Sequence, residues 1–453
     1  MKAELKTLSG SVTAKVLFIA LLVLILLIPL GMIEGVILER SHLYATARDG
    51  VGQSWGQAQA IGGPIVVVPF AYTRWVNGHA VTVNDELYAL PEQLEVTGHV
   101  ETQELRRGIY KIPVYTARLR VAGRFAPVVL ASEYEDLAIH WEQAAIALPI
   151  TDARSVREPI VLASGDGTTV FEAGGARVAG FGPLLVAPYA ALGLGALTAP
   201  QAFSFSLVLD GTGTLEFLPL GDETRVALTS DWPSPSFAGA YSPNDREVQD
   251  TGFTAEWRVL SLGRGFPSRW GRSEGPSQTA IADSAFGVQL ITPVGIHEAA
   301  LRAAKYGVLI VGLTFVAYFL FELFAPLRLH AFQYLLIGLA NCAFYLLLLA
   351  LAEHIGFGPA YFASAVAATA LITSYSGAVL RSLRRAAPIG GLLTALYGYL
   401  YVTLKAEDFA LLFGALGVFT ALAAFMYLTR RIDWFDVTFA SRTESGPSVQ
   451  LHA

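Results

Sequence analysis

Long apolar stretches dominate two parts of the chain. The first covers Val16–Ile33, and a second block begins at Tyr306 and fills nearly all of the C-terminal part. A helix needs roughly 20 apolar residues to cross the hydrocarbon core of a bilayer. By that length, charged or proline-containing breaks divide the second block into about five spans: Tyr306–Ala325, Phe332–Ala352, Ala360–Leu380, Ile389–Leu404 and Phe409–Leu428. The pattern predicts a polytopic α-helical membrane protein with about six membrane-spanning helices.

The first apolar run is predicted to be an uncleaved anchor rather than a signal peptide. It follows Lys2, Lys6 and Lys15, and a charged start of this kind is common to both classes of segment. The apolar region of a signal peptide is usually about 7–15 residues long and ends at a small-x-small cleavage site. Here the run is longer, and Glu34 and Glu39 follow it. Residues 16–33 are therefore assigned to the first membrane-spanning helix.

The distribution of cations predicts the orientation, because short cytoplasmic loops carry an excess of Lys and Arg. With residues 1–15 placed inside, the cytoplasmic side also receives Arg328, Arg381, Arg384, Arg385, Arg430 and Arg431, whereas the opposite short loops hold Glu353, His354, Lys405, Glu407 and Asp408. Both termini, including the tail 429–453, are then cytoplasmic, and residues 41–304 are exported. We expect a multi-pass protein of a bacterial inner (plasma) membrane.

The pattern changes to period two within residues 41–304, which is typical of strands with one buried face. Apolar and polar positions alternate along Tyr115–Phe125 and along Phe203–Leu209. A Gly-Thr-Gly turn at 211–213 then predicts a hairpin whose return strand holds Leu215 and Phe217, and whose meander continues through Val226 and Leu228. Further strands are predicted at Pro64–Phe70, Val81–Leu90 and Phe253–Val259.

These strands predict a large, mainly-β periplasmic domain inserted between the first and second membrane-spanning helices. Its length of about 260 residues exceeds what one sandwich normally needs. Whether it forms one lobe, or two that meet near Asp152–Pro159, stays open. The membrane domain then occupies residues 306–428.

Composition agrees with membrane residence and excludes several classes of function. The chain is 53% hydrophobic and only 15% charged, which is too apolar for an ordinary soluble globule. A net charge of −6 leaves no excess of cations for a nucleic-acid partner. The single cysteine, Cys342, lies in an apolar run, and the histidines are scattered. We therefore expect no internal disulfide, no metal site and no cofactor.

Glu322 is the strongest candidate for a functional side chain, because it lies in an apolar LFELF segment near the end of its span. An ionised carboxylate facing lipid costs a few kcal/mol, so Glu322 should face protein or the interface. A structural pairing with Arg328, with His330 or with a neighbouring helix is favoured over a role in transport or proton relay.

Three further candidates are weighed against structural roles. Asn341 lies near the middle of its span, where an amide more often joins helices than binds a substrate. Glu353 and His354 stand where a helix leaves the membrane, and an interfacial polar cap is favoured over a proton-handling pair.

No nucleophile-and-base pattern or catalytic motif is present, so no catalytic residue and no enzyme activity are predicted.

The segment 229–239 has several prolines and two large aromatics, and it is predicted to be an ordered loop. A role in sealing the core is at least as compatible with it as a role in binding a partner. Its candidate contact residues are Trp232, Pro233, Pro235 and Phe237.

Short motifs distributed over nearly the whole chain resemble those of the CreD family of inner-membrane proteins. They include Leu27-Ile28-Pro29, Glu39-Arg40, Gly63-Pro64, Gly108-Ile109-Tyr110, Asp152-Ala153-Arg154, Trp232-Pro233, Gly252-Phe253, Phe321-Glu322, Arg328-Leu329-His330, Glu353-His354 and Ile432-Asp433-Trp434. The charged R-L-H loop and the E-H exit at fixed spacing are the most specific among them.

The resemblance implies a protein of the Gram-negative cell envelope whose gene is controlled by a two-component regulator. It further implies an association with envelope integrity, colicin tolerance and the response to β-lactams, and it brings no catalytic residues. The leading hypothesis is therefore a non-enzymatic envelope-integrity and stress-response protein, held in the lipid bilayer, whose periplasmic domain contacts an unidentified envelope partner. The alternative is a transporter or lipid-handling permease that uses the C-terminal helices.

Overall fold

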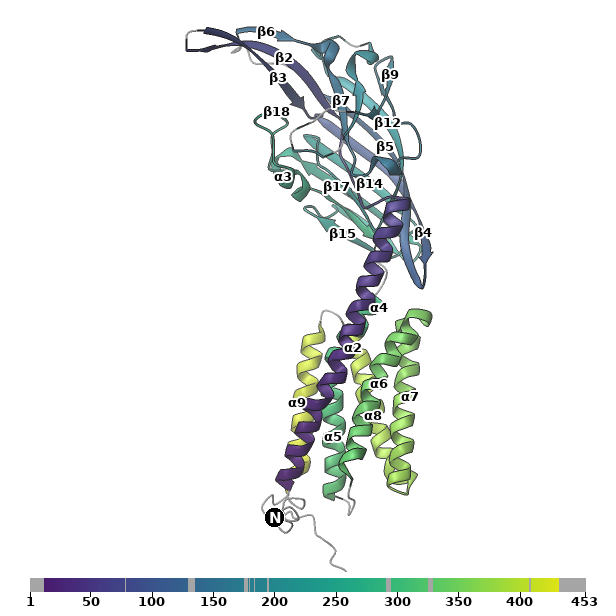
Figure 1. Cartoon of the computed structure of the whole chain (residues 1–453). Coiled ribbons are helices and arrows are strands. Elements are labelled where there is room, and N and C mark those ends of the chain that lie inside the picture. The colour runs from purple at the N-terminus through teal and green to yellow at the C-terminus, as the bar shows by residue number, and fades with distance from the viewer. Residues whose placement is uncertain are drawn as a thin grey trace, which may run out of the picture. The chain divides into compact units, whose positions relative to one another are not determined.

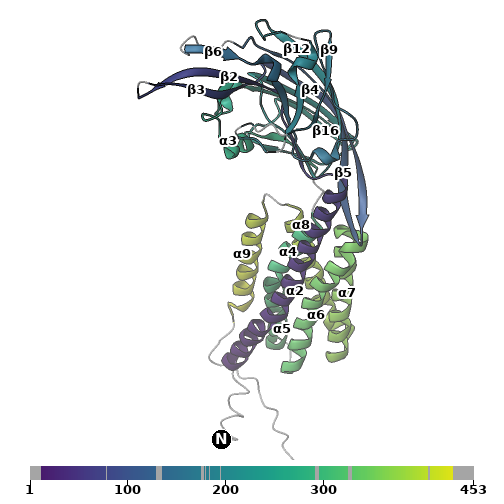
Figure 2. The same cartoon turned by 45° about the horizontal axis from the view of Figure 1, so that its top comes forward.

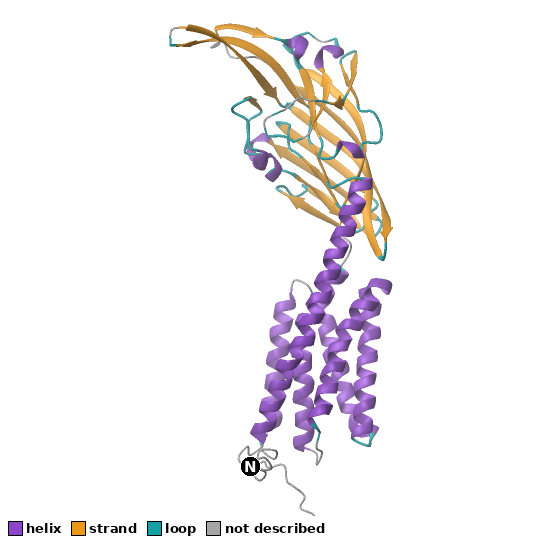
Figure 3. Ribbon diagram, in the orientation of Figure 1, coloured by secondary structure: helices purple, strands orange, loops and turns teal. Residues whose placement is uncertain are grey.

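The computed structural model describes residues 12–77, 79–128, 135–174, 178, 180–182, 184–193, 195–290, 295–324, 329–406 and 409–431. The chain forms two compact units (Figure 1). The helical unit comprises Met1–Leu43 and Val294–Ala453, and the strand-rich unit comprises Tyr44–Pro293. Figure 3 shows that the described strands belong to the second unit and that the first is built from helices. The predicted fold class is thus confirmed.

The helices of the C-terminal block follow the predicted spans closely. They are α4 (Ile296–Lys305), α5 (Gly307–Phe324), α6 (Ala331–Ile355), α7 (Phe357–Val379), α8 (Leu383–Lys405) and α9 (Ala410–Thr429). Among the described residues, five helices are long and apolar enough to cross a membrane, or up to six if the bent pair α4 and α5 forms one span.

The first helix is much longer than the predicted span. Helix α2 runs from Val12 to Trp55, so that the start of the domain predicted at residue 41 lies inside a helix. No proline interrupts the chain between Glu34 and Trp55. Val51 is buried against Ile112 and Val114 of the strand-rich unit, so tertiary packing supports the polar end of the helix.

The boundary at the other end of the strand-rich unit also differs from the prediction. Residues 296–304 were assigned by their sequence to the mainly-β domain, but they form α4 in the helical unit. Ala299, Ala300, Ala303 and Ala304 are buried on one face of this helix. Their spacing of three to four residues lets α4 pack closely against other helices. The charged residues of the same segment made it look too polar to be predicted as part of the helical unit.

The largest sheet of the strand-rich unit has eight strands, and their order is β16-β17-β14-β4-β5-β12-β8-β9. The bounds are β16 (Asp245–Gln249), β17 (Gly252–Leu260), β14 (Glu223–Ser230), β4 (Gln93–Arg107), β5 (Tyr110–Phe125), β12 (Gln201–Thr212), β8 (Val161–Ser164) and β9 (Gly167–Val170). Figure 2 shows β5 extending as a long ribbon with its hairpin partner β4, and the two strands pair over their full length.

Two smaller sheets complete the unit. One has seven strands, β10 (Glu172–Ala173), β11 (Leu184–Pro188), β7 (Ala145–Pro149), β2 (Ile65–Val76), β3 (His79–Ala89), β18 (Arg269–Gly271) and β6 (Glu135–Ile139). The other has four, β1 (Gln59–Ile61), β13 (Thr214–Phe217), β19 (Phe286–Leu290) and β15 (Pro235–Gly239). A short helix, α3, covers Gln278–Asp283.

One hydrophobic core joins the three sheets. It contains Val67 of the seven-stranded sheet, Leu119 of the eight-stranded sheet and Phe286 of the four-stranded sheet. Asp152 and Ser155 are buried within the same unit. The segment Asp152–Pro159 therefore connects strands of one compact body.

The strand predictions are correct in position but wrong in two pairings. β12 and β13 do not form a hairpin, because β12 pairs with β5 and β8 whereas β13 pairs with β1 and β19. The predicted meander is also absent, since β14 pairs with β17 and, in parallel, with β4. Gly213, with a φ of 76°, turns the chain from one sheet into another. Alternation identifies the buried face of a strand but not its neighbour.

The predicted loop at 229–239 is partly a strand. β15 (Pro235–Gly239) pairs with β19 at the edge of the four-stranded sheet. Proline is tolerated on edge strands, where its missing N–H need not serve a second neighbour. The prolines were therefore misleading at this position.

Candidate functional site

Glu322 is buried near the C-terminal end of α5, and its carboxylate binds groups from three other parts of the helical unit. Lys15 Nζ, at the start of α2, donates a hydrogen bond to the Oε1 atom of this carboxylate and forms a salt bridge with it. The backbone N–H of Leu329 donates to the same oxygen at 2.6 Å. The hydroxyl of Tyr334 in α6 donates to Oε2 at 2.9 Å. Both carboxylate oxygens are thus used within the chain.

The surroundings of this cluster are suited to a fixed ion pair. The Glu322 side chain is fully buried, whereas that of Lys15 is 21% exposed. Lys15 Nζ also donates to the Leu329 carbonyl at 3.3 Å and lies 5.6 Å from the centre of the Tyr334 ring. Additional hydrogen bonds to both partners, such as these, help a buried ion pair to offset its desolvation cost. The cluster therefore fastens α2 to α5 and α6.

Of the three predicted kinds of partner for Glu322, a neighbouring helix supplies the contacts, through Lys15 of α2 and Tyr334 of α6. Arg328 lies outside the described residues. His330 caps α6 instead, since its Nδ1 accepts from the N–H of Phe332 and the Gln333 side chain accepts from the N–H of His330. Sequence reasoning missed Lys15 as a partner. One signal could have identified it. Lys15 lies just before the first apolar run, and in the predicted topology this end of the first span is on the same side of the membrane as the end of the span that holds Glu322.

A second ion-pair cluster surrounds Glu353 near the C-terminal end of α6. Its Oε1 lies 3.9 Å from Arg40 Nε in α2 and 3.7 Å from His297 Nε2 in α4. The Glu353 side chain is only 10% exposed, so its carboxylate is largely enclosed within the helical unit. The neighbouring His354 is exposed, and its Nδ1 lies 3.0 Å from the Ala350 carbonyl. Glu353 and His354 therefore have separate environments and do not form one pair.

The two clusters fasten α2 at widely separated points. Lys15 and Arg40 are 25 positions apart in the numbering of this continuous helix. At 1.5 Å per residue, this separation is about 37 Å, which exceeds the roughly 30 Å thickness of a hydrocarbon core. The separation is therefore long enough for the two charged clusters to lie at opposite interfaces of a membrane, where charges cost less than at the centre.

Asn341 joins two helices between these levels. The residue is fully buried, and its Nδ2 donates to the Ile337 carbonyl at 3.0 Å. The hydroxyl of Tyr397 in α8 donates to Asn341 Oδ1 at 3.0 Å. Tyr361 in α7 donates in turn to the Tyr397 carbonyl at 2.6 Å. This arrangement matches the role of an interhelical hydrogen bond.

The predicted contact segment of the strand-rich unit faces largely inward. Trp232 is 8% exposed, and its Nε1 donates to the Ser234 carbonyl at 3.1 Å. Phe237 packs edge-on against Phe253 and Trp257, with centroid distances of 5.6 and 5.8 Å. Pro233 is exposed and Pro235 is half-buried. The geometry agrees with the core-sealing alternative for Trp232 and Phe237.

A buried guanidinium in the strand-rich unit escaped the sequence analysis. The Arg264 side chain is fully buried, and it donates to the carbonyls of Gly221 at 2.7 Å and Phe266 at 3.1 Å. It also donates to Ser268 Oγ at 2.6 Å and lies 3.4 Å from Asp222 Oδ1. Burial lowers the pKa of Arg264 below its usual value, although Asp222 opposes that effect. No local pattern distinguishes this arginine from an exposed one.

The end of α2 enters a polar network within the strand-rich unit. Asp210 is buried and forms a short ion pair with Arg157, whose guanidinium lies 5.1 Å from the centre of the Trp55 ring. Gln59 Nε2 donates to Ser155 Oγ at 2.9 Å and to the Asp210 carbonyl at 3.2 Å. These contacts fix the segment between the end of α2 at Trp55 and the start of β1 at Gln59.

None of these clusters has the composition of a metal centre. Within the described ranges, no group of three or more His, Cys, Asp or Glu side chains is placed to hold a metal ion. The polar groups that are brought together serve as helix fasteners or as loop supports.

Comparisons with known proteins agree with this architecture over almost the whole chain. The family model described as "Inner membrane protein CreD" matches residues 11–435. The chain is also 34% identical over 427 residues to a protein of Escherichia coli (strain K12) named "Inner membrane protein CreD". That alignment covers 91% of each of the two chains.

Proposed function

This chain belongs to the CreD family of inner membrane proteins, and we propose that it acts as a non-enzymatic protein of cell-envelope integrity. In this proposal the helical unit is a stable anchor, and the strand-rich unit contacts a partner in the periplasm. The main support for the anchor role is that Glu322 is paired with Lys15 and accepts a hydrogen bond from Tyr334. A carboxylate whose two oxygens are both bound within the chain supports a structural role over a path for ions or substrates.

The outer face of the eight-stranded sheet is the surface that suits contact with a partner. Arg118 and Arg120 project from the same face of β5 and are exposed. Their neighbours across β4 are His99 and Thr97. The two arginines form a cationic pair on a polar face that also carries the exposed Glu95 and Glu101, and the pair favours a partner with carboxylate or phosphate groups.

We also propose that both termini are cytoplasmic and that the strand-rich unit is periplasmic. The basis is the excess of arginines at one set of helix ends. Arg381 lies between α7 and α8, Arg384 and Arg385 lie in the first turn of α8, and all three are exposed. The same orientation places Lys15 on the cytoplasmic side and Arg40 on the periplasmic side.

The orientation predicts which introduced cysteines react with a membrane-impermeant maleimide. Cys342 is buried and should give no background. Leu262 of the strand-rich unit and Leu383 at the start of α8 are 94% and 71% exposed. We expect Leu262→Cys to be labelled in intact spheroplasts, and Leu383→Cys to be labelled only after the membrane is permeabilised. The reverse pattern would refute the proposed orientation.

Contact with a partner predicts a position-dependent crosslink in living cells. A photoreactive amino acid at Arg120 should yield a discrete, larger product, because this position lies in the exposed cationic part of the sheet. Phe362 of α7 is 72% exposed and serves as the matched control. The charge reversal Arg118→Glu should weaken the Arg120 product. An Arg120 product that is absent, or insensitive to this reversal, would argue against the sheet face as the contact surface.

The transporter alternative has weaker support. A substrate path needs polar groups that are available to an ion or solute. Asn341 and Glu322 are both bound to other side chains of the helical unit. The cavity between α5 and α9 is lined almost entirely by apolar side chains and lies at the side of these helices.

A further inference from the structure

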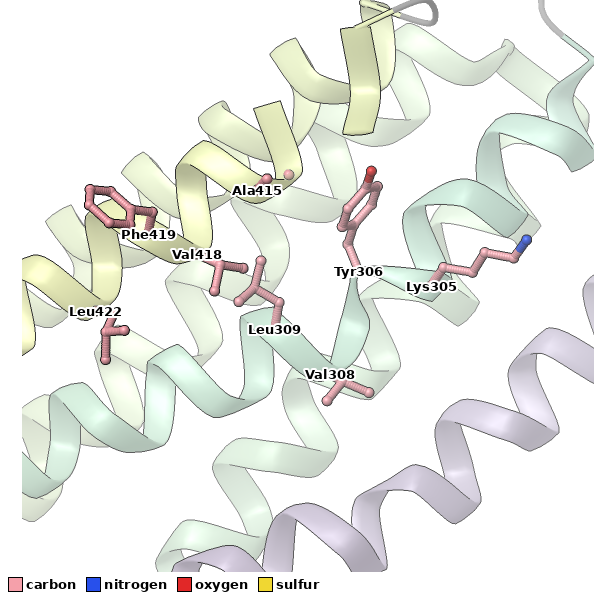
Figure 4. Close-up of a pocket in the computed structure, with 9 residues that line it drawn as sticks. Lys305, Tyr306, Val308, Leu309, Ala415, Val418, Phe419 and Leu422 are labelled. Atoms are coloured by element: carbon pink, nitrogen blue, oxygen red, sulfur yellow. The ribbon is translucent and has the colours of Figure 1, made fainter. Parts of the chain in front are cut away.

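The cavity between α5 and α9 is a groove whose shape and lining suit one lipid chain. It encloses about 700 Å³. Figure 4 shows Leu309 and Val418 pointing toward one another across it, with Tyr306 reaching toward α9. In the same view Lys305, the last residue of α4, extends with its ammonium clear of the groove.

Helix α9 meets its neighbours through glycines, which leaves its larger side chains free to line the groove. A Cβ atom on Gly414 would lie 3.3 Å from the Tyr306 ring, and one on Gly417 would lie 2.7 Å from the Tyr399 ring. The side chains at 415, 418, 419 and 422 recur every three to four residues and therefore form one stripe. The contact with Tyr306 closes one end of the groove, and the stripe continues away from it.

The stripe is short enough to fit within the depth of one leaflet. From Ala415 to Leu422 the helix rises by about 10 Å, whereas one leaflet contributes about 15 Å of hydrocarbon. Val418, Phe419 and Leu422 are 49%, 70% and 55% exposed. In a membrane-spanning chain such surfaces contact acyl chains, and an empty apolar groove would forfeit its dispersion contacts.

The closed end of the groove has the chemistry of a headgroup site. Lys305 is exposed there on a flexible stem, and it directly precedes Tyr306 in the chain. Tyrosines and lysines at a membrane interface lie at headgroup level, and each cation there attracts anionic lipid.

We propose that this groove holds one acyl chain of an anionic phospholipid, from the leaflet at which α5 and α9 begin, with its phosphate at Lys305. A second copy of α9 is a poorer occupant. The stretch Leu412–Thr429 contains no charged residue, so that it would give Lys305 no anion. The inference rests on residence in the membrane and not on the proposed envelope contact.

The test uses the full-length protein in nanodiscs of phosphatidylethanolamine that contain a trace of phosphatidylglycerol with a photoreactive acyl chain. Val418→Trp fills the groove, and Leu416→Trp on another face of α9 is its matched control, because Leu416 is 53% exposed and does not line the groove. Lys305→Gln removes the cation, and Lys405→Gln removes an exposed lysine outside the groove.

We expect crosslinking of the probe to α5 and α9 to fall severalfold in Val418→Trp and about fivefold in Lys305→Gln, while both controls keep the level of the unsubstituted chain. Replacing the probe with a phosphatidylcholine analogue should remove the effect of Lys305→Gln. Equal crosslinking in Val418→Trp and Leu416→Trp would overturn the site. A dimer that Val418→Trp dissociates, without any loss of lipid, would assign the groove to a second copy.

Discussion

Replacing Glu322 with leucine is expected to remove most of the folded, membrane-inserted protein. The substitution leaves the Lys15 ammonium, the Leu329 N–H and the Tyr334 hydroxyl without their shared acceptor. Removing one partner of a buried ion pair typically costs about 3–5 kcal/mol of unfolding free energy. That loss is a large part of the stability of a typical domain. The measurement is the amount of monodisperse protein extracted from membranes at equal expression.

A double-mutant comparison separates the ion pair from a general effect of the leucine. Combining Glu322→Leu with Lys15→Met should recover part of the lost protein, because an apolar pair no longer leaves a charge uncompensated. Glu39→Leu, at an exposed carboxylate of α2, should leave the amount unchanged. If the double variant were no better than Glu322→Leu alone, Lys15 would not be the partner that matters.

Replacing Arg264 with alanine is expected to destabilise the strand-rich unit by about 3–5 kcal/mol, because its buried hydrogen-bond acceptors would lose their donors. Arg264→Lys should also be destabilising, since one ammonium cannot reproduce a fork that binds Gly221, Phe266 and Ser268 together.

Urea unfolding followed by tryptophan fluorescence tests this expectation in the full chain. Six of the seven tryptophans lie between residues 44 and 293, so the signal reports mainly on the strand-rich unit. Arg225→Ala is the matched control, because Arg225 is 59% exposed and forms a surface ion pair with Glu223. A midpoint for Arg264→Ala equal to that of the control would show that the buried network adds little stability.

Sequence patterns located the helices because spanning a bilayer requires length and apolarity, and both are local properties. The same patterns did not predict the secondary structure of segments whose conformation depends on tertiary contacts. The continuation of α2 to Trp55 depends on Val51 packing against β5. The helical character of α4 depends on a face of alanines that only becomes apparent beside its neighbours.

Strand positions followed from alternation, whereas strand partners did not. β5 and β12 lie where the alternation predicted them, yet β13 belongs to another sheet. Pairing is set by which buried faces share a core, and that information is not contained in one strand. β15 shows the same limit, since its proline excluded a central strand but not an edge strand.

The sequence predicted which side chains of the candidate site must be paired, but it identified only some of their partners. The cost of a charge in hydrocarbon indicated that Glu322 must be paired. Its partner Lys15 is 307 positions away, and such a pairing follows from helix packing. Asn341 was expected to join helices, and its bond to Tyr397 has that form. The charge of Arg264 gave no indication that the residue is buried.

The most direct test of the proposed anchor role is the activity of Glu322→Gln per inserted molecule. Glutamine keeps the shape and one carbonyl acceptor of Glu322 but cannot carry its charge or exchange a proton at neutral pH. Membrane-inserted protein should be quantified alongside detergent and colicin sensitivity in cells that lack the native copy. We predict that the phenotype follows abundance, with protection per inserted molecule unchanged. A variant that is normally abundant but gives no protection would contradict the anchor role and favour transport through the helical unit.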